Sequence, residues 1–319
     1  MRAEYKLFYT ILALIISLMA GKFLIPVLTR LKIGQSIRDD GPQSHMVKSG
    51  TPTIGGLIFI SSFLLVNIIS RNINLDIGVI IISTLLFGLT GFFDDYIKVV
   101  NKRNLGFTAL QKLICQIIGA CIVIIYLYFK DDLSTSIIVP FIKRSVDMGI
   151  FYIPFILFVV VGTVNAVNLT DGLDGLASGT SIITFIFFAI CSKKLGQTNI
   201  ELFCLIMVGA ILGFLYFNKY PAKVFMGDTG SLTLGGAVSA VAVLLKMPLI
   251  LPICCGIFFI EALSVIIQVT SFKLRGKRVF LMSPLHHHFE QKGWKETKIV
   301  FVFCTVQVIL CIISYFIIF

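Results

Sequence analysis

The sequence predicts an all-α, polytopic integral membrane protein with about ten transmembrane helices, and three observations support this fold class. Hydrophobic residues make up 57% of the 319 residues, and charged residues only 13%. The mean hydropathy is +0.97, far towards the apolar side of the scale. Apolar runs of about 17–22 residues recur along the whole chain, each long enough to cross a hydrocarbon layer roughly 30 Å thick. The short alternating segments of an outer-membrane barrel are absent from the sequence.

Each apolar run predicts one membrane span. The first run continues past Ala20 without a convincing cleavage motif, so we expect a retained span rather than a signal peptide. The ten expected spans cover residues 7–28, 54–70, 77–93, 113–129, 150–167, 176–191, 200–217, 231–246, 248–270 and 299–319.

The distribution of basic residues predicts the orientation of these spans. The loops that follow the odd-numbered spans hold 17 of the 27 Lys and Arg residues, whereas the N-terminus and the other loops hold 9. The positive-inside rule therefore places the odd-numbered loops in the cytoplasm and both termini outside the cytoplasm. The same rule explains the net charge of +11, so we expect no nucleic acid as a partner.

The eight cysteines all lie in or beside apolar spans, and none forms a C-x-x-C pair. We interpret them as small membrane or core residues rather than disulfides or zinc ligands.

Residues 165–179, with the sequence NAVNLTDGLDGLASG, form an unusually polar junction between two apolar runs. Asp171 and Asp174 are three residues apart, which places both carboxylates on one side if the backbone is helical there. Asn165 and Asn168 add neutral donors and acceptors. Carboxylates without a nearby basic residue indicate a magnesium-phosphate site or a polar face towards a substrate. The alternative is a glycine-rich turn with two helix-capping Asp residues.

Asp94 and Asp95 are adjacent at the expected end of the third span, and Lys98 follows four residues after Asp94. Two carboxylates at a helix C-terminus oppose the helix dipole unless a cation or proton offsets their charge. The alternative is a solvated helix end with one ion pair, worth a few tenths of a kcal/mol. Lys112, before the next span, either binds phosphate or obeys the positive-inside rule.

Asp228 stands in the loop before the eighth span, in the sequence MGDTGS. It is a candidate helix N-cap or a ligand for a hard metal ion. Glycine on both sides of the Asp-Thr pair favours the metal site, because capping does not require it.

His286, His287 and His288 are consecutive, and they are three of the four His residues in the chain. Three consecutive imidazoles cannot all point at one ion from regular secondary structure, so the run does not favour a three-histidine zinc site. Beside basic residues they suit hydrogen bonding to a diphosphate or a sugar; the alternative is a solvated polar run. Glu261, near the middle of the ninth span, should face protein or a polar groove.

Together these motifs resemble the polyprenyl-phosphate N-acetylhexosamine-1-phosphate transferase superfamily. The resemblance covers nearly the whole chain and rests on DDYIK at 94–98, NAVNLTDGLDGL at 165–176, FMGDTGS at 225–231 and SPLHHHFE at 283–290. NLTDGLDGL and the triple His resemble the phospho-N-acetylmuramoyl-pentapeptide branch more than the GlcNAc-1-phosphate branch. The resemblance implies that residues 1–319 form a single transmembrane catalytic domain, active on the cytoplasmic face of the bacterial cytoplasmic (inner) membrane.

The resemblance also implies an activity. The expected reaction transfers phospho-MurNAc-pentapeptide from UDP-MurNAc-pentapeptide to undecaprenyl phosphate, giving lipid I and UMP with Mg²⁺ as cofactor. By motif, Asp228 is the expected Mg²⁺ ligand, and Asp94 is the expected base or nucleophile with Asp95 beside it. Lys98 and Lys112 match positions near the phosphates. The residues expected on the donor side are Asn165, Asn168, Asp171, Asp174, Phe225 (uracil), His286, His287 and His288.

Two further expectations come from the resemblance. The ninth span should be broken and lean into lipid, with Glu261 and Gln268 as polar residues that fit a break, and the protein should be able to form a homodimer. Two other functions stay open at this point: a UDP-GlcNAc transferase of the same fold, and a cation-coupled transporter whose acids bind ions near the membrane midplane.

Overall fold

The computed structural model describes residues 3–31, 34, 50–101, 106–130, 135–142 and 144–319. Helices dominate, and each of the ten expected spans coincides with helical structure. The helices and strands are α1 (Ala3–Arg30), α2 (Gly56–Ile69), α3 (Leu75–Val100), α4 (Ala109–Lys130), β1 (Ser136–Val139), β2 (Arg144–Asp147), α5 (Tyr152–Thr170), α6 (Leu176–Lys194), α7 (Thr198–Asn218), α8 (Gly227–Leu244), α9 (Leu251–Cys254), α10 (Gly256–Arg275), α11 (Leu285–Gln291) and α12 (Glu296–Ile318).

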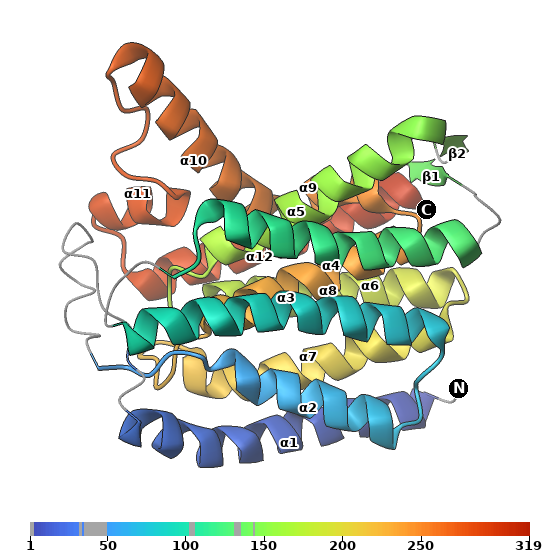
Figure 1. The fold of residues 1–319 in the computed structure, drawn as a ribbon, viewed down its shortest axis with the longest axis horizontal. Coiled ribbons are helices and arrows are strands. Elements are labelled where there is room, and N and C mark those ends of the chain that lie inside the picture. Colours follow the sequence, from blue (N-terminus) through green and yellow to red (C-terminus); the bar gives the residue numbers. More distant parts are fainter. Residues whose placement is uncertain (1–2, 32–33, 35–49, 102–105, 131–134, 143) are drawn as a thin grey trace.

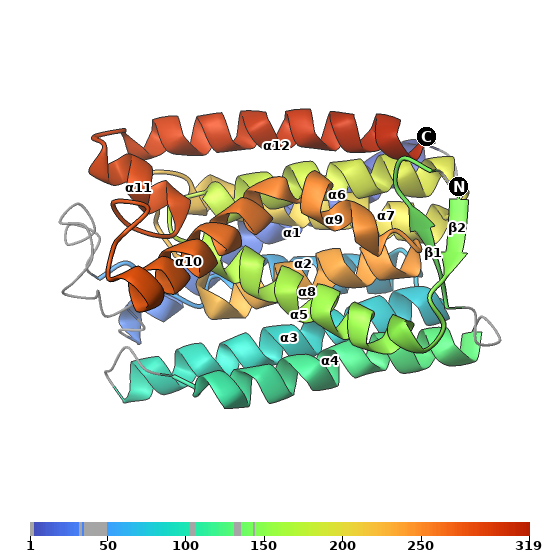
Figure 2. The same ribbon diagram turned by 90° about the horizontal axis from the view of Figure 1, so that it is seen from above.

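The long helices form a bundle that is built around α8 (Figures 1 and 2). α8 packs against α3, α5 and α2, and every residue from Thr229 to Val243 is buried. Many of these residues are Gly, Ser, Thr or Ala, which allow helix backbones to approach closely. Both ends of the chain lie at one end of the bundle, whereas α11 lies at the opposite end (Figure 1).

Eight helices in the described part of the chain are long and apolar enough to cross a membrane, and α2 is a shorter apolar helix of 14 residues. Apolar side chains face outward from the bundle: only 22% of the most apolar window of α1 and 28% of that of α12 are buried. Outward-facing apolar surface of this extent needs lipid around it. The predicted integral membrane protein is therefore confirmed.

A short β-hairpin interrupts the otherwise all-α architecture. The sequence did not predict this hairpin. β1 pairs antiparallel with β2, with Ser136 opposite Asp147. The backbone N–H of Ile138 also donates to the carbonyl of Lys246 at 2.8 Å, and Ile137 is buried. The hairpin is thus attached by a hydrogen bond just beyond the end of α8, and the Ile137 side chain packs into the core.

The predicted ninth span is broken, and the break lies at Cys255, between α9 and α10. α10 then leaves the bundle as a separate arm (Figure 1). Gln307 of α12 donates to the carbonyl of Cys254 and accepts from the N–H of Ile257 at 3.2 Å, so it satisfies both sides of the break. Unpaired backbone groups are costly in apolar surroundings. α10 is continuous through Glu261 and Gln268, so the break lies before both of these polar residues.

Candidate active site

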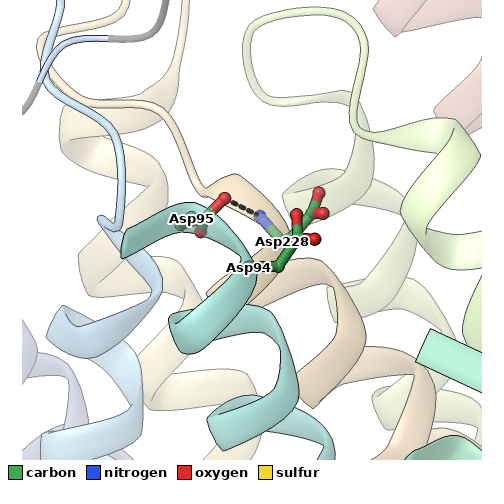
Figure 3. A group of neighbouring side chains, drawn as sticks. All are labelled: Asp94, Asp95 and Asp228. Carbon is green, nitrogen blue, oxygen red and sulfur yellow. Dashed lines mark hydrogen bonds between the residues drawn. The ribbon is translucent and has the colours of Figure 1, made fainter. Parts of the chain in front are cut away.

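Three carboxylates from two helices meet at the end of the bundle that carries α11. Asp94 and Asp95 lie in the last two turns of α3, and Asp228 lies in the first turn of α8 (Figure 3). One oxygen from each carboxylate lies within 4.8 Å of the others. The two helices approach closely at Gly91, where a Cβ atom would lie 2.1 Å from the carbonyl oxygen of Asp228. Only glycine permits this approach.

Two lysines hold these carboxylates together. The Nζ atom of Lys98 lies 2.6 Å from Asp94 Oδ2 and 2.9 Å from Asp228 Oδ2. Lys112, in the first turn of α4, lies 3.1 Å from Asp94 Oδ2 and 2.7 Å from Asp228 Oδ2. α3 continues past its predicted end to Val100, so Lys98 follows Asp94 on one helical face. The structure therefore joins Asp94 and Lys98 to Asp228 and Lys112, although Asp228 lies more than 100 residues from the other three in the sequence.

Asp95 has a different role from its neighbour. Its carboxylate accepts the backbone N–H groups of Asp228 at 3.2 Å and Thr229 at 2.9 Å, and the Thr229 hydroxyl at 2.7 Å. The N-cap residue of α8, Met226, supplies no side-chain cap. Asp95, a residue of α3, therefore does for α8 what an N-cap side chain would do. Asp228 does not cap α8, so the N-cap alternative for this residue is wrong.

The two asparagines of α5 have different partners. Asn168 Nδ2 donates to Asp228 Oδ1 at 2.9 Å and to Ser231 Oγ at 2.8 Å. Asn165, one turn earlier, donates instead to Gln116 Oε1 of α4 at 2.8 Å. The structure therefore places Asn168 in the acidic cluster and Asn165 at a helix contact. Ser231 belongs to the MGDTGS motif that the sequence analysis identified, whereas nothing in the sequence singles out Gln116.

The segment 171–175 is a turn between α5 and α6. Asp171 and Asp174 were expected on one side only if the backbone there is helical, and it is not. Gly175 adopts a left-handed conformation there, with φ of 80°. The backbone N–H of Asp171 donates to the carbonyl of Asn168 at 3.2 Å. Burial, and then the charge of Asp228, raises the pKa of Asp171 to about 8.

Asp174 joins two other segments to the turn. Its carboxylate accepts the N–H of Ala222 at 2.9 Å, in the segment before α8, and its own N–H donates to Glu296 at 2.6 Å, at the start of α12. Its side chain is buried. These contacts hold the turn in place.

Phe225 lies in the same segment before α8, and its backbone is tied to the chain that enters α2. Its N–H donates to the carbonyl of Pro52 at 2.8 Å, and its carbonyl accepts the N–H of Gly55 at 2.9 Å. The ring is half-buried. These two hydrogen bonds therefore hold the chain segment that precedes Asp228.

The three histidines lie on α11, and each has its own partner. His286 is buried against Glu261 of α10, whereas His287 Nδ1 lies 2.6 Å from Glu290 Oε2. His288 Nδ1 accepts the N–H of Leu281 at 3.1 Å. Partial burial, and then the charge of Lys292, lowers the pKa of His288. The run is thus part of a folded helix rather than a solvated loop.

Comparison with known proteins identifies the family. Residues 77–246 match glycosyl transferase family 4. The chain is 54% identical over 324 residues to a phospho-N-acetylmuramoyl-pentapeptide-transferase of Alkaliphilus oremlandii (strain OhILAs), covering 98% of both chains. It is 51% identical over 310 residues to the protein of that name from Clostridium novyi (strain NT), covering 97% of this chain and 95% of the relative.

The chain belongs to the phospho-N-acetylmuramoyl-pentapeptide-transferase family.

As a member of the phospho-N-acetylmuramoyl-pentapeptide-transferase family, the chain is a transferase, and the acidic cluster lies within the matched range 77–246. The donor set of the cluster fits a hard divalent cation, since Asp94 and Asp228 present carboxylate oxygens close together. Asp95 is less suited to a metal, because its oxygens already bind the start of α8. α10 and the three histidines lie beyond the matched range.

Proposed function

We propose that this chain transfers phospho-MurNAc-pentapeptide from UDP-MurNAc-pentapeptide to undecaprenyl phosphate, giving lipid I and UMP for peptidoglycan synthesis. The observation that carries this proposal is the cluster of Asp94, Asp228, Lys98 and Lys112 at one end of an apolar helix bundle. A nucleotide donor arrives from water, and a polyprenyl acceptor stays in lipid. A charged site at the end of membrane helices is open to both.

The proposed reaction is a single phosphoryl transfer. An oxygen of the acceptor phosphate attacks the donor phosphorus that carries the sugar. The P–O bond to UMP breaks, and its electron pair leaves on the UMP phosphate. Lys98 and Lys112, each within 3.1 Å of the two carboxylates they bridge, place positive charge where the phosphates meet. When bound, Mg²⁺ supplies further neutralisation of the diphosphate.

We assign Asp228 as the Mg²⁺ ligand, with Asp94 as the second carboxylate at the reacting phosphates. The acceptor phosphate is largely ionised at neutral pH, because its second pKa is about 6. Removal of a proton therefore contributes little, and Asp94 acts by orientation and charge. Asp95 positions Asp228 by capping α8.

The donor side of the site is assigned to Asp171, Phe225, His287 and His288. These residues lie around the same end of the bundle, and none of them is fully buried. Asn168 holds Asp228 in place. Asn165 and Asp174, which the resemblance also put on the donor side, support the site through Gln116 and Ala222.

We further propose that all ten helical segments span the bacterial cytoplasmic membrane, with both termini outside and the acidic cluster on the cytoplasmic side. The excess of Lys and Arg in the odd-numbered loops supports this orientation. So does the position of both chain ends, away from α11 (Figure 1). A phosphatase reporter fused after Phe319 should be active, since that enzyme folds only outside the cytoplasm; an inactive, stable fusion would reverse the orientation.

One measurement tests the function. The purified protein, given undecaprenyl phosphate and Mg²⁺, should release UMP from UDP-MurNAc-pentapeptide and not from UDP-GlcNAc. Release from UDP-GlcNAc alone would make the chain a GlcNAc-1-phosphate transferase of the same fold. Absence of UMP with both donors would contradict the transferase and favour a cation-coupled transporter.

A further inference from the structure

A chain of contacts connects the arm α10 to the acidic cluster through His286. The carboxylate of Glu261, fully buried in α10, lies 3.2 Å from Nδ1 of His286. The same carboxylate accepts the backbone N–H of His286, with its two oxygens at 3.2 and 3.4 Å. Glu261 therefore holds the backbone of His286 and lies beside its ring.

The other edge of the His286 ring faces the turn between α5 and α6. A Cβ atom on Gly172 would lie 2.2 Å from His286 Nε2, so the ring touches the glycine backbone directly. His286 has 1% of its surface exposed. The ring therefore fills a closed space between α10 and the turn, and its Nε2 edge is covered by the protein.

The turn that His286 contacts leads directly to Asp228. The backbone N–H of Asp171, next to Gly172, donates to the carbonyl of Asn168 at 3.2 Å. Asn168 Nδ2 in turn donates to Asp228 Oδ1 at 2.9 Å. A displacement of Gly172 therefore moves Asp171 and, through it, the asparagine that holds the Asp228 carboxylate.

A separate apolar cluster joins the same elements. It brings together side chains from the turn and α6, from α10, from α11 and from α12. Its buried members are Leu173, Leu176, Ile257, Ile299 and Phe303, and the residues packed against them include Leu285 and Phe289 of α11. This cluster buries the space between the same elements that Glu261 and His286 connect, so the packing and the polar contacts favour one arrangement.

We propose that Glu261 and His286 are positioning residues: through Gly172 and Asp171 they hold Asp228 in place from α10. The activity readout of this proposal rests on the function proposed above. His286 then differs from His287 and His288, because it acts on the turn rather than on the donor. The resemblance placed all three histidines on the donor diphosphate or sugar.

Gly172→Ala and His286→Ala test this in a double-mutant cycle. The methyl group that Gly172→Ala introduces collides with the His286 ring, so we expect this variant to lower both the thermal unfolding temperature and kcat. In the double variant the ring is absent and the collision disappears, so both quantities should match those of His286→Ala alone. Gly162→Ala is the matched control, since a Cβ atom there meets nothing within 4 Å.

The cycle separates the proposal from its alternative. Independent sites give additive effects, whereas a direct contact should couple the two substitutions by at least about threefold in kcat. Additive losses in both unfolding temperature and kcat, with a raised KM for the donor in His286→Ala, would overturn the proposal and make His286 a donor ligand. If even the wild type releases no UMP, the proposed function fails, and the cycle in unfolding temperature still decides on the contact.

Glu261 offers a second test through a conservative variant. Glu261→Gln keeps an oxygen that can accept the His286 N–H, and we expect its kcat to stay within about threefold of wild type. Glu261→Ala removes the acceptor and should lose as much as His286→Ala, with the donor KM little changed. Equal activity of Glu261→Ala and wild type would remove Glu261 from the proposal.

Discussion

The carboxylate of Asp95 on α3 accepts the backbone N–H of Thr229 on α8 at 2.9 Å. A buried acid on one helix thereby caps another helix, whose free N–H groups and positive dipole end favour a negative charge. The adjacent Asp94 carboxylate instead contacts Lys98 and Lys112. Of these two adjacent residues, Asp95 therefore holds α8 in place and Asp94 forms part of the charged site.

Replacement of Asp95 should first affect stability. Asp95→Ala leaves the donors of Asp228 and Thr229 without a partner, and a buried unsatisfied group costs about 1–3 kcal/mol. We expect a lower thermal unfolding temperature in detergent and lower activity, because Asp228 loses its support. Asp95→Asn, which keeps one acceptor oxygen, should lose less of both. Unchanged unfolding temperature in Asp95→Ala would show that the cap contributes nothing.

Replacement of Asp228 should remove activity without unfolding the protein. Asp228→Asn keeps the shape of the side chain but removes the charge that Mg²⁺ would bind. We expect turnover to fall by a factor of about 100 or more, as when a charge-stabilising group is lost at a reacting phosphate. Ser239→Ala, also on α8, is the control, since the Ser239 hydroxyl donates to the carbonyl of Gly236 in its own helix at 3.0 Å. Near wild-type turnover of Asp228→Asn at saturating Mg²⁺ would exclude the metal role.

Replacement of Asp94 should separate turnover from binding. Asp94→Asn removes the negative charge that pairs with Lys98 and Lys112, so we expect kcat to fall far more than the affinity for the donor. The two quantities are measured by UMP release and by equilibrium binding of the UDP donor. A collapse of donor binding with normal residual turnover would move Asp94 from the reacting phosphates to the donor pocket.

The raised pKa of Asp171 predicts proton release on Mg²⁺ binding. With a pKa of about 8, this carboxyl group is mostly neutral at pH 7, and a nearby cation favours its charged form. Mg²⁺ affinity should therefore increase as pH rises towards 8. Calorimetry in two buffers of different ionisation enthalpy counts the released protons, and Asp171→Asn should reduce that number. The same proton count in the variant would assign the release to another group.

Sequence reasoning located the helices well, because an apolar run of about 20 residues has little choice but to span the membrane as a helix. It also singled out Asp94 and Asp228, which stand where charges are costly and which the structure brings together. It could not assign separate roles to Asp94 and Asp95. Neighbours on a helix point about 100° apart, and only the packing of α3 against α8 decides which of the two meets the N-terminus of α8.

Features that depend on contacts between distant segments also could not be predicted from the sequence. Gln307 completes the break at Cys255 from another helix, so the break has no local signal. The spacing of Asp171 and Asp174 left both a helix and a glycine-rich turn open for residues 171–175. Gly175 has a left-handed conformation, which ends the helical path and makes the segment a turn. Burial separated His286 from His287, although the two are adjacent and identical in type.

The burial of α8 on all sides has a consequence for how this protein tolerates change. A helix at the rim of the bundle has a lipid-facing side on which one apolar residue can replace another. From Thr229 to Val243, α8 has no such side. In a library of single variants selected for growth, we expect substitutions that enlarge side chains in α8 to disappear first, including those far from Asp228. A densely packed interior has no room for them, so the slowest-changing part of the chain should extend from the acidic cluster along the whole central helix.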